Sequence, residues 1–208
     1  MPIFRSGEAP PPWCELGGFE ILDLKEGAVV DQARRGPAER LLVTFGTIQL
    51  ALPERTLILK ENQFLDVVNE AWRLRACSAK VQLVRLFGRW GRDVGGCGIF
   101  RVAEQAKPVN SGDPVSYEKR TSVDSHYHDC DEYWVILEGR GTVVIGDRHM
   151  KVTSGDCVPI GMGHHHDMPL APEAVKAVFF ETTLERQKRV GHLWAHTHGA
   201  AQPAVERI

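Results

Sequence analysis

The chain has 208 residues, 43% of them hydrophobic, which is enough for one large domain or for two domains of about 100 residues each. Its 25 basic and 27 acidic residues give a formal charge of −2 and are spread along the chain. Nothing in this pattern favours a nucleic acid or an anionic membrane as partner, so a small-molecule partner is the first expectation.

The N-terminal residues contain prolines and a single arginine where a signal peptide needs an unbroken apolar run. No later segment approaches the roughly 20 apolar residues of a membrane span, so we expect no membrane association and a cytoplasmic location. The five cysteines show no CxxC spacing, which favours free thiols in a reducing compartment over a disulfide framework. They are Cys14, Cys77, Cys97, Cys130 and Cys157.

Short runs rich in Val, Ile, Leu, Phe and Thr alternate with Gly, Pro, Asn and Asp, and this pattern predicts an all-β sandwich or barrel. The best helical candidate is TTLERQKRV. It overlaps the start of a short C-terminal helical tail, which we expect over residues 186–208. In chain order the predicted strands are RLLVTF, TIQLAL, RTLILK, QFLDVV, KVQLVRLF, YWVILE, TVVIG, HMKVT, DCVPI and VKAVFFET.

The second half of the chain aligns with the first at an offset of 93 residues without gaps. Asn62 falls on Gly155, and both residue types tolerate the left-handed conformation that a tight turn often needs. Chance coincidence of two β-rich patterns is the alternative, but a gap-free register over many strands favours an internal repeat. Other aligned pairs are Glu39 with Glu132, Gly46 with Gly139, and Arg55 with Arg148.

The repeat predicts two β domains, over residues 13–92 and 113–185. Between them, residues 93–112 form a Gly- and Pro-bearing linker with room for one added strand at GCGIFRV.

A cluster of metal-ligand residues lies in the stretch SHYHDCDEYWVILEG. On a strand, alternate residues share a face, so His126, His128, Glu132 and Trp134 can point the same way. Imidazole nitrogens and a carboxylate oxygen are good ligands for Fe, Mn, Ni, Cu or Zn. We therefore expect one divalent transition metal, Fe, Mn, Zn or Ni, bound by these residues.

The spacing HxHxxxE, then six residues and Gly139, is followed after fifteen residues by GDCVPIGMGHHH. This resembles the two motifs of the cupin superfamily, strongly over about one hundred residues and elsewhere only through the repeat. The resemblance implies a small antiparallel jelly-roll barrel whose first motif supplies two histidines and a glutamate, and whose second supplies a further histidine from a facing strand. The family's proline before the last turn is replaced here by Gly161, which is expected to loosen that turn.

Three consecutive histidines compete for the fourth ligand position. Counting from Gly155 in the family pattern gives Gly163 as the turn glycine and His166 as the ligand. His164 lies in the turn, where it either hydrogen-bonds a ligand, contacts substrate or faces solvent. His165 is expected to face solvent.

Subtracting 93 from the four predicted ligands gives Ala33, Arg35, Glu39 and Arg73. Two guanidiniums would repel a cation, so we expect a degenerate, metal-free N-terminal cupin domain in which Glu39 pairs with one of these two arginines. An anion pocket built on the two arginines is the alternative, but such residues are usually satisfied ion pairs.

Other candidate site residues have competing interpretations. Tyr133 and Trp134 follow the ligand glutamate; Trp134 either walls the substrate pocket or fills the barrel core. Cys130 is either a soft ligand, a redox-sensitive thiol or a loop residue. The tail histidines His192, His196 and His198 either form a second metal site, close over the barrel or simply pack with Trp194 on its exterior.

The resemblance implies an enzyme, because four protein ligands leave coordination positions open. We expect a metal-dependent cupin enzyme acting on a small oxygen-rich metabolite that coordinates the metal, with dioxygenase-type chemistry favoured over isomerase, epimerase or lyase chemistry. The competing interpretations are a small-molecule binding or sensor module and a storage protein. The duplication can supply internally the contact of a cupin dimer, so a monomer or a homodimer is expected.

Overall fold

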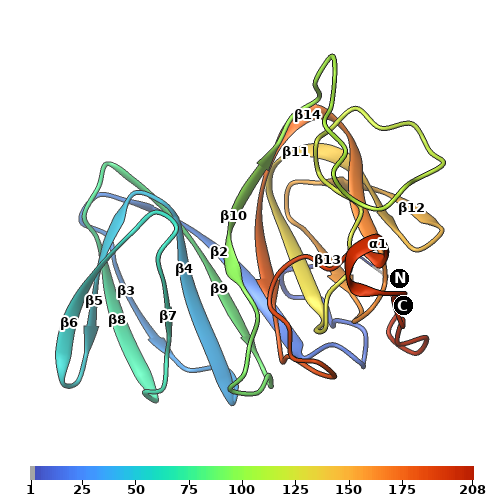
Figure 1. Cartoon of the computed structure of the whole chain (residues 1–208). Coiled ribbons are helices and arrows are strands. Elements are labelled where there is room, and N and C mark those ends of the chain that lie inside the picture. Colours follow the sequence, from blue (N-terminus) through green and yellow to red (C-terminus); the bar gives the residue numbers. More distant parts are fainter. Residues whose placement is uncertain (1–2) are drawn as a thin grey trace. The chain divides into compact units, whose positions relative to one another are not determined.

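The computed structural model describes residues 3–208 and shows two compact units. The N-terminal unit contains Ser6–Pro10 and Glu15–Trp90. The C-terminal unit contains Gly91–Ile208 together with Pro11–Cys14 and the described residues up to Arg5. Nearly all regular structure in both units is β-strand (Figure 1), which confirms the predicted all-β class.

The N-terminal unit consists of two four-stranded antiparallel sheets, in the orders β2-β9-β4-β7 and β3-β8-β5-β6. The strands alternate between core and solvent: in β8, Trp72, Leu74 and Ala76 are buried and the residues between them are exposed. The strands are β2 (Leu16–Lys25), β3 (Val29–Ala33), β4 (Ala38–Phe45), β5 (Thr47–Leu52), β6 (Arg55–Lys60), β7 (Phe64–Asp66), β8 (Ala71–Ala76) and β9 (Lys80–Gly88).

The C-terminal unit is built around two long strands, β11 and β14, which lie side by side (Figure 1). They pair from Glu132 opposite Glu181 to Ile145 opposite His166, with four register shifts. Such irregularities bend a strand pair, so the two long strands can curve around the interior of a small barrel. The strands of this unit are β1 (Phe4–Arg5), β10 (Cys97–Val102), β11 (Glu132–Ile145), β12 (Arg148–Thr153), β13 (Asp156–Ile160) and β14 (His166–Glu181).

The strand pairing of the two units follows the predicted offset of 93 residues. The hairpin β5–β6 pairs Thr47 with Lys60, and the hairpin β11–β12 pairs Arg140 with Thr153 at the shifted positions. The next turn also repeats: Asn62 N donates to Val43 O (2.8 Å), and the shifted pair is Gly155 N to Ile136 O (2.9 Å). Asn62 and Gly155 both have positive φ, 63° and 92°, as the alignment predicted.

This turn allows a direct test of the backbone requirement. Asn62→Ala is expected to lower the free energy of unfolding by about 1–2 kcal/mol, because alanine tolerates the left-handed conformation poorly. Asn62→Gly should be close to neutral or stabilising, since glycine is the residue at the repeated position. Urea unfolding of the three proteins measures the difference; equal destabilisation by both substitutions would instead assign the role to the asparagine side chain.

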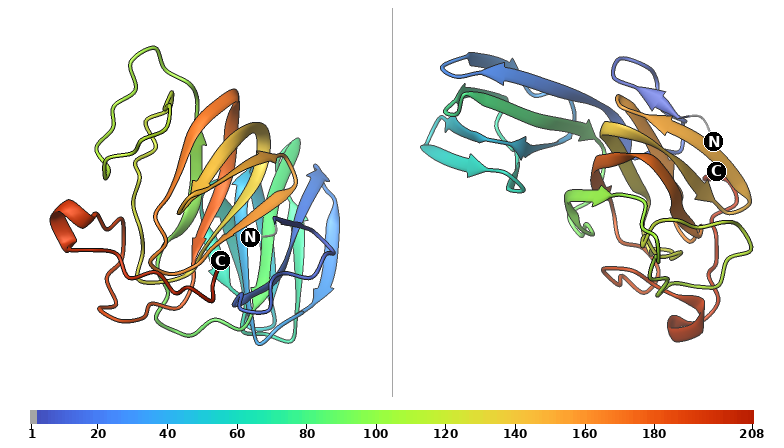
Figure 2. Two further views of the ribbon diagram at one scale, coloured as in Figure 1. Left: turned by 90° about the vertical axis from the view of Figure 1, so that its right-hand side faces the viewer. Right: turned by 90° about the horizontal axis from the view of Figure 1, so that it is seen from above.

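The C-terminal tail differs from expectation in where its helix lies. TTLERQKRV is not helical: Arg186 and Lys188 have positive φ, and the Leu184 amide bonds to Asp93 O rather than within a helical turn. The one helix among the described residues, α1 (Ala195–His198), is a single turn further along the tail (Figure 2). No helix within residues 3–208 has the length and apolar character needed to cross a bilayer.

The strand predicted at GCGIFRV forms as β10 and pairs with β14. Much of the stretch predicted as a linker therefore contributes structure to the C-terminal unit.

Candidate metal centre

Four side chains with metal-ligand chemistry meet inside the C-terminal unit. His126 and His128 precede β11, Glu132 begins β11, and His166 begins β14. A backbone bridge holds the loop against the strand, with His166 N donating to His126 O (2.9 Å). The candidate ligand atoms of all four residues lie within 4.8 Å of one another, and all four residues are buried. The structure thus brings together the four residues predicted as ligands.

Each of the three imidazoles is oriented by a backbone carbonyl. Because a carbonyl can only accept, the ring atom Nδ1 must carry the proton, and Nε2 presents a lone pair. Burial lowers the pKa of each of these imidazoles to about 3, so all three are neutral at physiological pH. The Nδ1 contacts are His126 to Asp124 O (2.9 Å), His128 to Gly191 O (3.1 Å) and His166 to His164 O (2.9 Å).

The inward-facing atoms of this cluster are all acceptors. His126 Nε2 lies 3.1 Å from His128 Nε2, and His166 Nε2 lies 2.9 Å from Glu132 Oε2. With the protons on Nδ1, no hydrogen stands between either pair, and both Glu132 Oε2 and His166 Nε2 are buried without a hydrogen-bond donor. Buried acceptors normally have a partner. Three neutral imidazoles and one carboxylate converging in this way fit a divalent transition metal.

A second carboxylate, Glu181, lies beside the cluster at the end of β14. Burial, with a contribution from the charge of Glu132, raises the pKa of Glu181 to about 7. Its Oε2 accepts from the amide of Gly96 (2.6 Å). A Cβ at Gly95 would lie 2.2 Å from Glu181 Oε2, so the backbone can approach this carboxylate only because glycine is present.

His192, from the C-terminal tail, lies against the candidate ligand His126. The two rings are stacked, with centroids 3.6 Å apart. His192 Nδ1 lies 3.0 Å from Asp124 Oδ2, which also accepts from Trp194 Nε1 (2.7 Å). Burial opposes the charge of His192, but the hydrogen bond to Asp124 prevails and raises the pKa of the imidazole.

A cavity of about 300 Å³ opens next to the four ligand candidates. Two of them, His126 and Glu132, line it, together with Glu181 and His192. The other lining residues are Phe100, Arg101, Val102, Ala103, Gln105, Ser122, Val123, Asp124, Trp134 and Phe179. The cluster is therefore accessible to a small molecule.

The three consecutive histidines have three different contacts. His166 joins the cluster, whereas His165 Nε2 lies 2.8 Å from Asp113 Oδ2. The His164 ring is directed at the tail, with Nε2 2.9 Å from Ala204 O. His164, predicted to act at the site, therefore does not join the cluster and reaches it only through its carbonyl, which accepts from His166.

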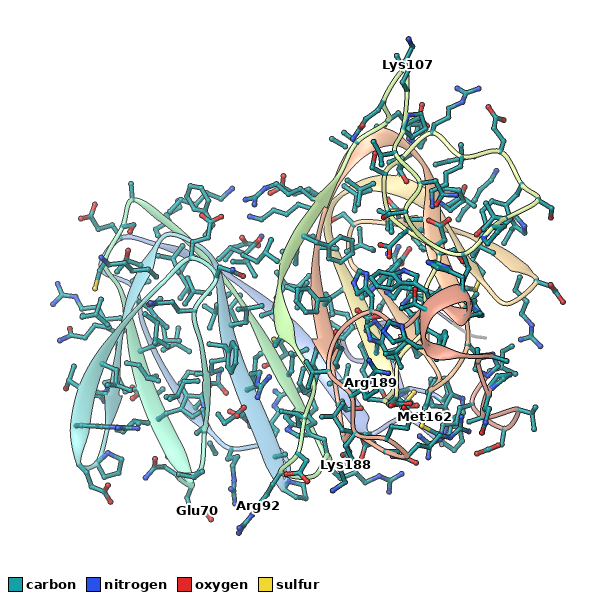
Figure 3. All side chains as sticks on the ribbon, viewed as in Figure 1. Glu70, Arg92, Lys107, Met162, Lys188 and Arg189 are labelled. Atoms are coloured by element: carbon teal, nitrogen blue, oxygen red, sulfur yellow. The ribbon has the colours of Figure 1, made fainter. Side chains whose placement is uncertain are left out.

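Gly161 does not loosen the turn as expected; it lets the tail approach. A Cβ at this position would lie 2.0 Å from Arg207 O. Within the same turn Met162, labelled in Figure 3, accepts a hydrogen bond from Ala204 N (3.0 Å). The Arg207 side chain then bonds Asp131 (3.1 Å), so the tail is fixed over the turn that delivers His166.

The two aromatic candidates have different environments. Trp134 lines the cavity, and its ring centroid is 5.5 Å from that of His166. Tyr133 points to the opposite side of the strand from Trp134, because successive strand residues face opposite sides. It is fully buried there and hydrogen-bonds Cys14. The structure therefore does not bring Tyr133 to the cluster.

The other tail histidines are held by local contacts. His196 Nδ1 lies 2.7 Å from Asp113, and His198 Nδ1 accepts from Trp194 N (3.0 Å). Asp113 also accepts from the amide of Ala195 (2.7 Å). Of the three tail histidines, only His192 reaches the cavity.

Glu39 of the N-terminal unit, which stands where Glu132 does in the other unit, has an unexpected partner. Arg85 Nη2 donates to it (2.8 Å), and both side chains are completely buried. Trp72 Nε1 donates to its second oxygen (2.6 Å). A guanidinium therefore neutralises this carboxylate.

The two arginines expected beside Glu39 have other partners. Arg73 forms an exposed pair with Asp31, and the Arg35 guanidinium pairs with Glu20 (2.8 Å). Only the backbone amide of Arg35 bonds Glu39 (2.9 Å). Neither an anion pocket on these arginines nor their predicted pairing with Glu39 is present.

Of two further cavity residues, Glu181 was not predicted, and His192 was named only among the tail histidines that could form a second metal site, close over the barrel or pack on its exterior. The sequence did contain a signal for Glu181. It lies two residues beyond Phe179 on the same face of an apolar strand, where a buried charge is unfavourable unless it has a partner or a function. No local pattern distinguishes His192 from its neighbours in the tail.

The fold of the chain is matched by known proteins. A family model for the cupin domain matches residues 98–181. The uncharacterized protein y4oW of Sinorhizobium fredii is 50% identical over 214 residues, covering 100% of this chain and 97% of that protein. The chain belongs to the cupin family.

Solved structures show the same fold at low sequence identity. AerE from Microcystis aeruginosa matches with a TM-score of 0.56 and 10% identity, covering 80% of this chain and 87% of that one. An IolB-like protein from Salmonella typhimurium LT2 gives 0.55 and 14%, covering 87% and 88%. Oxalate decarboxylase from Bacillus subtilis, described with Mn(II) centres, gives 0.52 and 10%, covering 80% and 68%. At such identities these likenesses concern the fold alone.

Proposed function

We propose that this cupin is a metal-dependent enzyme acting on a small oxygen-rich metabolite. His126, His128, Glu132 and His166 would hold one divalent transition metal. The supporting observation is the convergence of four buried acceptor atoms, two of them without a hydrogen-bond donor, beside a cavity open to a small ligand. A bound metal would supply Lewis-acid chemistry and, if it is iron or manganese, redox chemistry.

The set of protein ligands favours a substrate with oxygen donors. Three neutral imidazoles and one carboxylate leave a divalent ion with a net positive charge, which attracts carboxylate, enolate or hydroxyl oxygens. Four protein ligands also leave room in a five- or six-coordinate ion. The carbonyls that accept from the three Nδ1 atoms keep the rings in place, so little reorganisation is needed when substrate enters.

We place dioxygenase chemistry first and isomerase or lyase chemistry second. The second candidate is favoured by Glu181, because its carboxylate lines the cavity and can hold a proton there. The Gly96 amide occupies Oε2 of this residue, which leaves Oε1 for a proton or a substrate hydroxyl.

We also propose that the N-terminal unit is a second, metal-free cupin barrel, in which the Arg85 guanidinium neutralises Glu39. Two barrels in one chain would provide internally the contact that single-domain cupins make as dimers. We therefore expect a monomer, or a homodimer through another surface, with about one metal per chain.

The test is elemental analysis of the purified protein, combined with mass spectrometry of any organic molecule that co-purifies. Exposure of the holoprotein to ¹⁸O₂ should label a co-purified substrate if the chemistry is oxygenation. Deuterium uptake from D₂O without ¹⁸O, abolished in Glu181→Gln, would select isomerase or lyase chemistry. A protein with stoichiometric metal and a ligand that takes up neither isotope would be a binding module, and a protein without metal would refute the proposal.

A further inference from the structure

The side chains inside the C-terminal barrel change from carboxylates to aromatic rings within two residues along two paired strands. Glu132 of β11 is paired with Glu181 of β14, and two residues deeper Trp134 is paired with Phe179. All four side chains line the cavity. Because alternate residues share a face, a carboxylate layer is followed directly by an aromatic layer.

A third aromatic residue, Phe100 of β10, completes this second layer. Its ring centroid is 5.2 Å from that of Trp134 and 6.5 Å from that of Phe179, with planes tilted by 57° and 56°. Val102 and Val123 extend the apolar wall. Phe100 and Phe179 pack on the hydrophobic core and yet stay partly exposed, so an apolar surface faces the cavity.

Most of the buried polar groups of the cavity lie at its other end. His126, Glu132, Glu181 and His192 form or adjoin the ligand cluster. Arg101, Gln105 and Ser122 also line the cavity, and Ser122 Oγ donates to Gln105 Oε1 (3.0 Å). A ligand that is polar on every side would press some hydroxyl or carboxylate groups against the three aromatic rings without partners, which is unfavourable. A ligand with oxygen donors at one end and an apolar ring at the other matches both layers.

We infer that the substrate carries one aromatic or similarly flat apolar ring adjacent to its metal-binding oxygens, and that Phe100, Trp134 and Phe179 form the subsite for that ring. This inference rests on the proposed function, since the metal would hold the oxygen end. A cavity of about 300 Å³ has room for a single-ring compound and lies at the lower limit of the roughly 300–1,000 Å³ found for small-molecule sites.

A matched pair of chelators tests the ring subsite. Benzohydroxamate and acetohydroxamate bind metals through the same two oxygens and differ only in the group on the carbonyl carbon, which is a phenyl ring in the first and a methyl group in the second. By isothermal titration of the metal-loaded protein, benzohydroxamate should bind about 10-fold more tightly, because its ring buries apolar surface against aromatic side chains. Phe100→Ala should remove most of this difference and leave acetohydroxamate affinity within about twofold.

Phe100→Leu provides a second variant that preserves apolar bulk if the alanine variant unfolds, and it should lose an intermediate part of the preference. Metal content and circular dichroism verify that each variant retains the site. Equal affinities for the two chelators, tighter binding of acetohydroxamate, or no binding of either to metal-loaded protein would overturn the ring subsite. Absence of metal from the wild-type protein would instead overturn the proposed function.

Discussion

His166→Ala should reduce the metal content of the purified protein from about one transition metal per chain to near zero, and His126→Ala should do the same. Each substitution removes one of four converging ligand atoms and leaves Glu132 Oε2 buried beside the gap. The remaining three ligands bind the ion less tightly than four, so they are not expected to retain it through dialysis. Elemental analysis after extensive dialysis measures the loss.

His164→Ala and His165→Ala are the matched controls, because they lie in the same three-residue run. His164 bonds the tail carbonyl of Ala204, and His165 bonds Asp113, so neither side chain faces the cluster. Both variants should keep about one metal per chain, although His164→Ala loosens the tail. Full occupancy in His166→Ala together with loss in His164→Ala would show that the ligand register is wrong.

Arg85→Met should destabilise the N-terminal unit by about 3–5 kcal/mol, the range seen when one partner of a buried ion pair is removed. Arg85 and Glu39 are both completely buried, and loss of the guanidinium leaves the Glu39 charge without its counter-ion. Urea unfolding followed by circular dichroism, with hydrogen exchange on β9 to assign the transition, measures the change.

The double variant Arg85→Met/Glu39→Gln should be more stable than Arg85→Met, because the amide keeps an acceptor for Trp72 and carries no charge. Arg73→Met breaks the exposed pair with Asp31 and should have little effect. The metal content should stay at about one per chain in all three variants, since the proposed ligands belong to the other unit. If Arg73→Met destabilised the protein as much as Arg85→Met, burial would not determine how much each ion pair contributes to the free energy of unfolding.

Local sequence information was sufficient for much of the fold. Most strands were predicted because they are runs of β-branched and apolar residues between turn residues. β8 was harder to detect: AWRLRA buries alternate residues only and has arginines between them. β3 has no fully buried residue, and its only apolar run is the pair Val29 and Val30, too short to indicate a strand.

The helix prediction failed for a tertiary reason. TTLERQKRV has an acceptable helical composition, but its backbone amides bond to carbonyls of other segments, such as Glu185 N to Asp129 O. These contacts hold Arg186 and Lys188 in left-handed conformations that end any helix. Local propensity cannot report such competition.

The sequence by itself determined the fold family and the candidate ligand set, because HxHxxxE and the turn after Gly155 place ligands through strand periodicity and short spacing, which are local properties. Only the tertiary structure decided what surrounds them. Gly191 and His192 arrive from the tail, and Glu181 arrives from the far end of β14 opposite Glu132. The partner of Glu39, likewise, is Arg85 on a neighbouring strand. Such contacts join residues distant in the chain, and they depend on which strands pair and where the tail packs, which no short pattern contains.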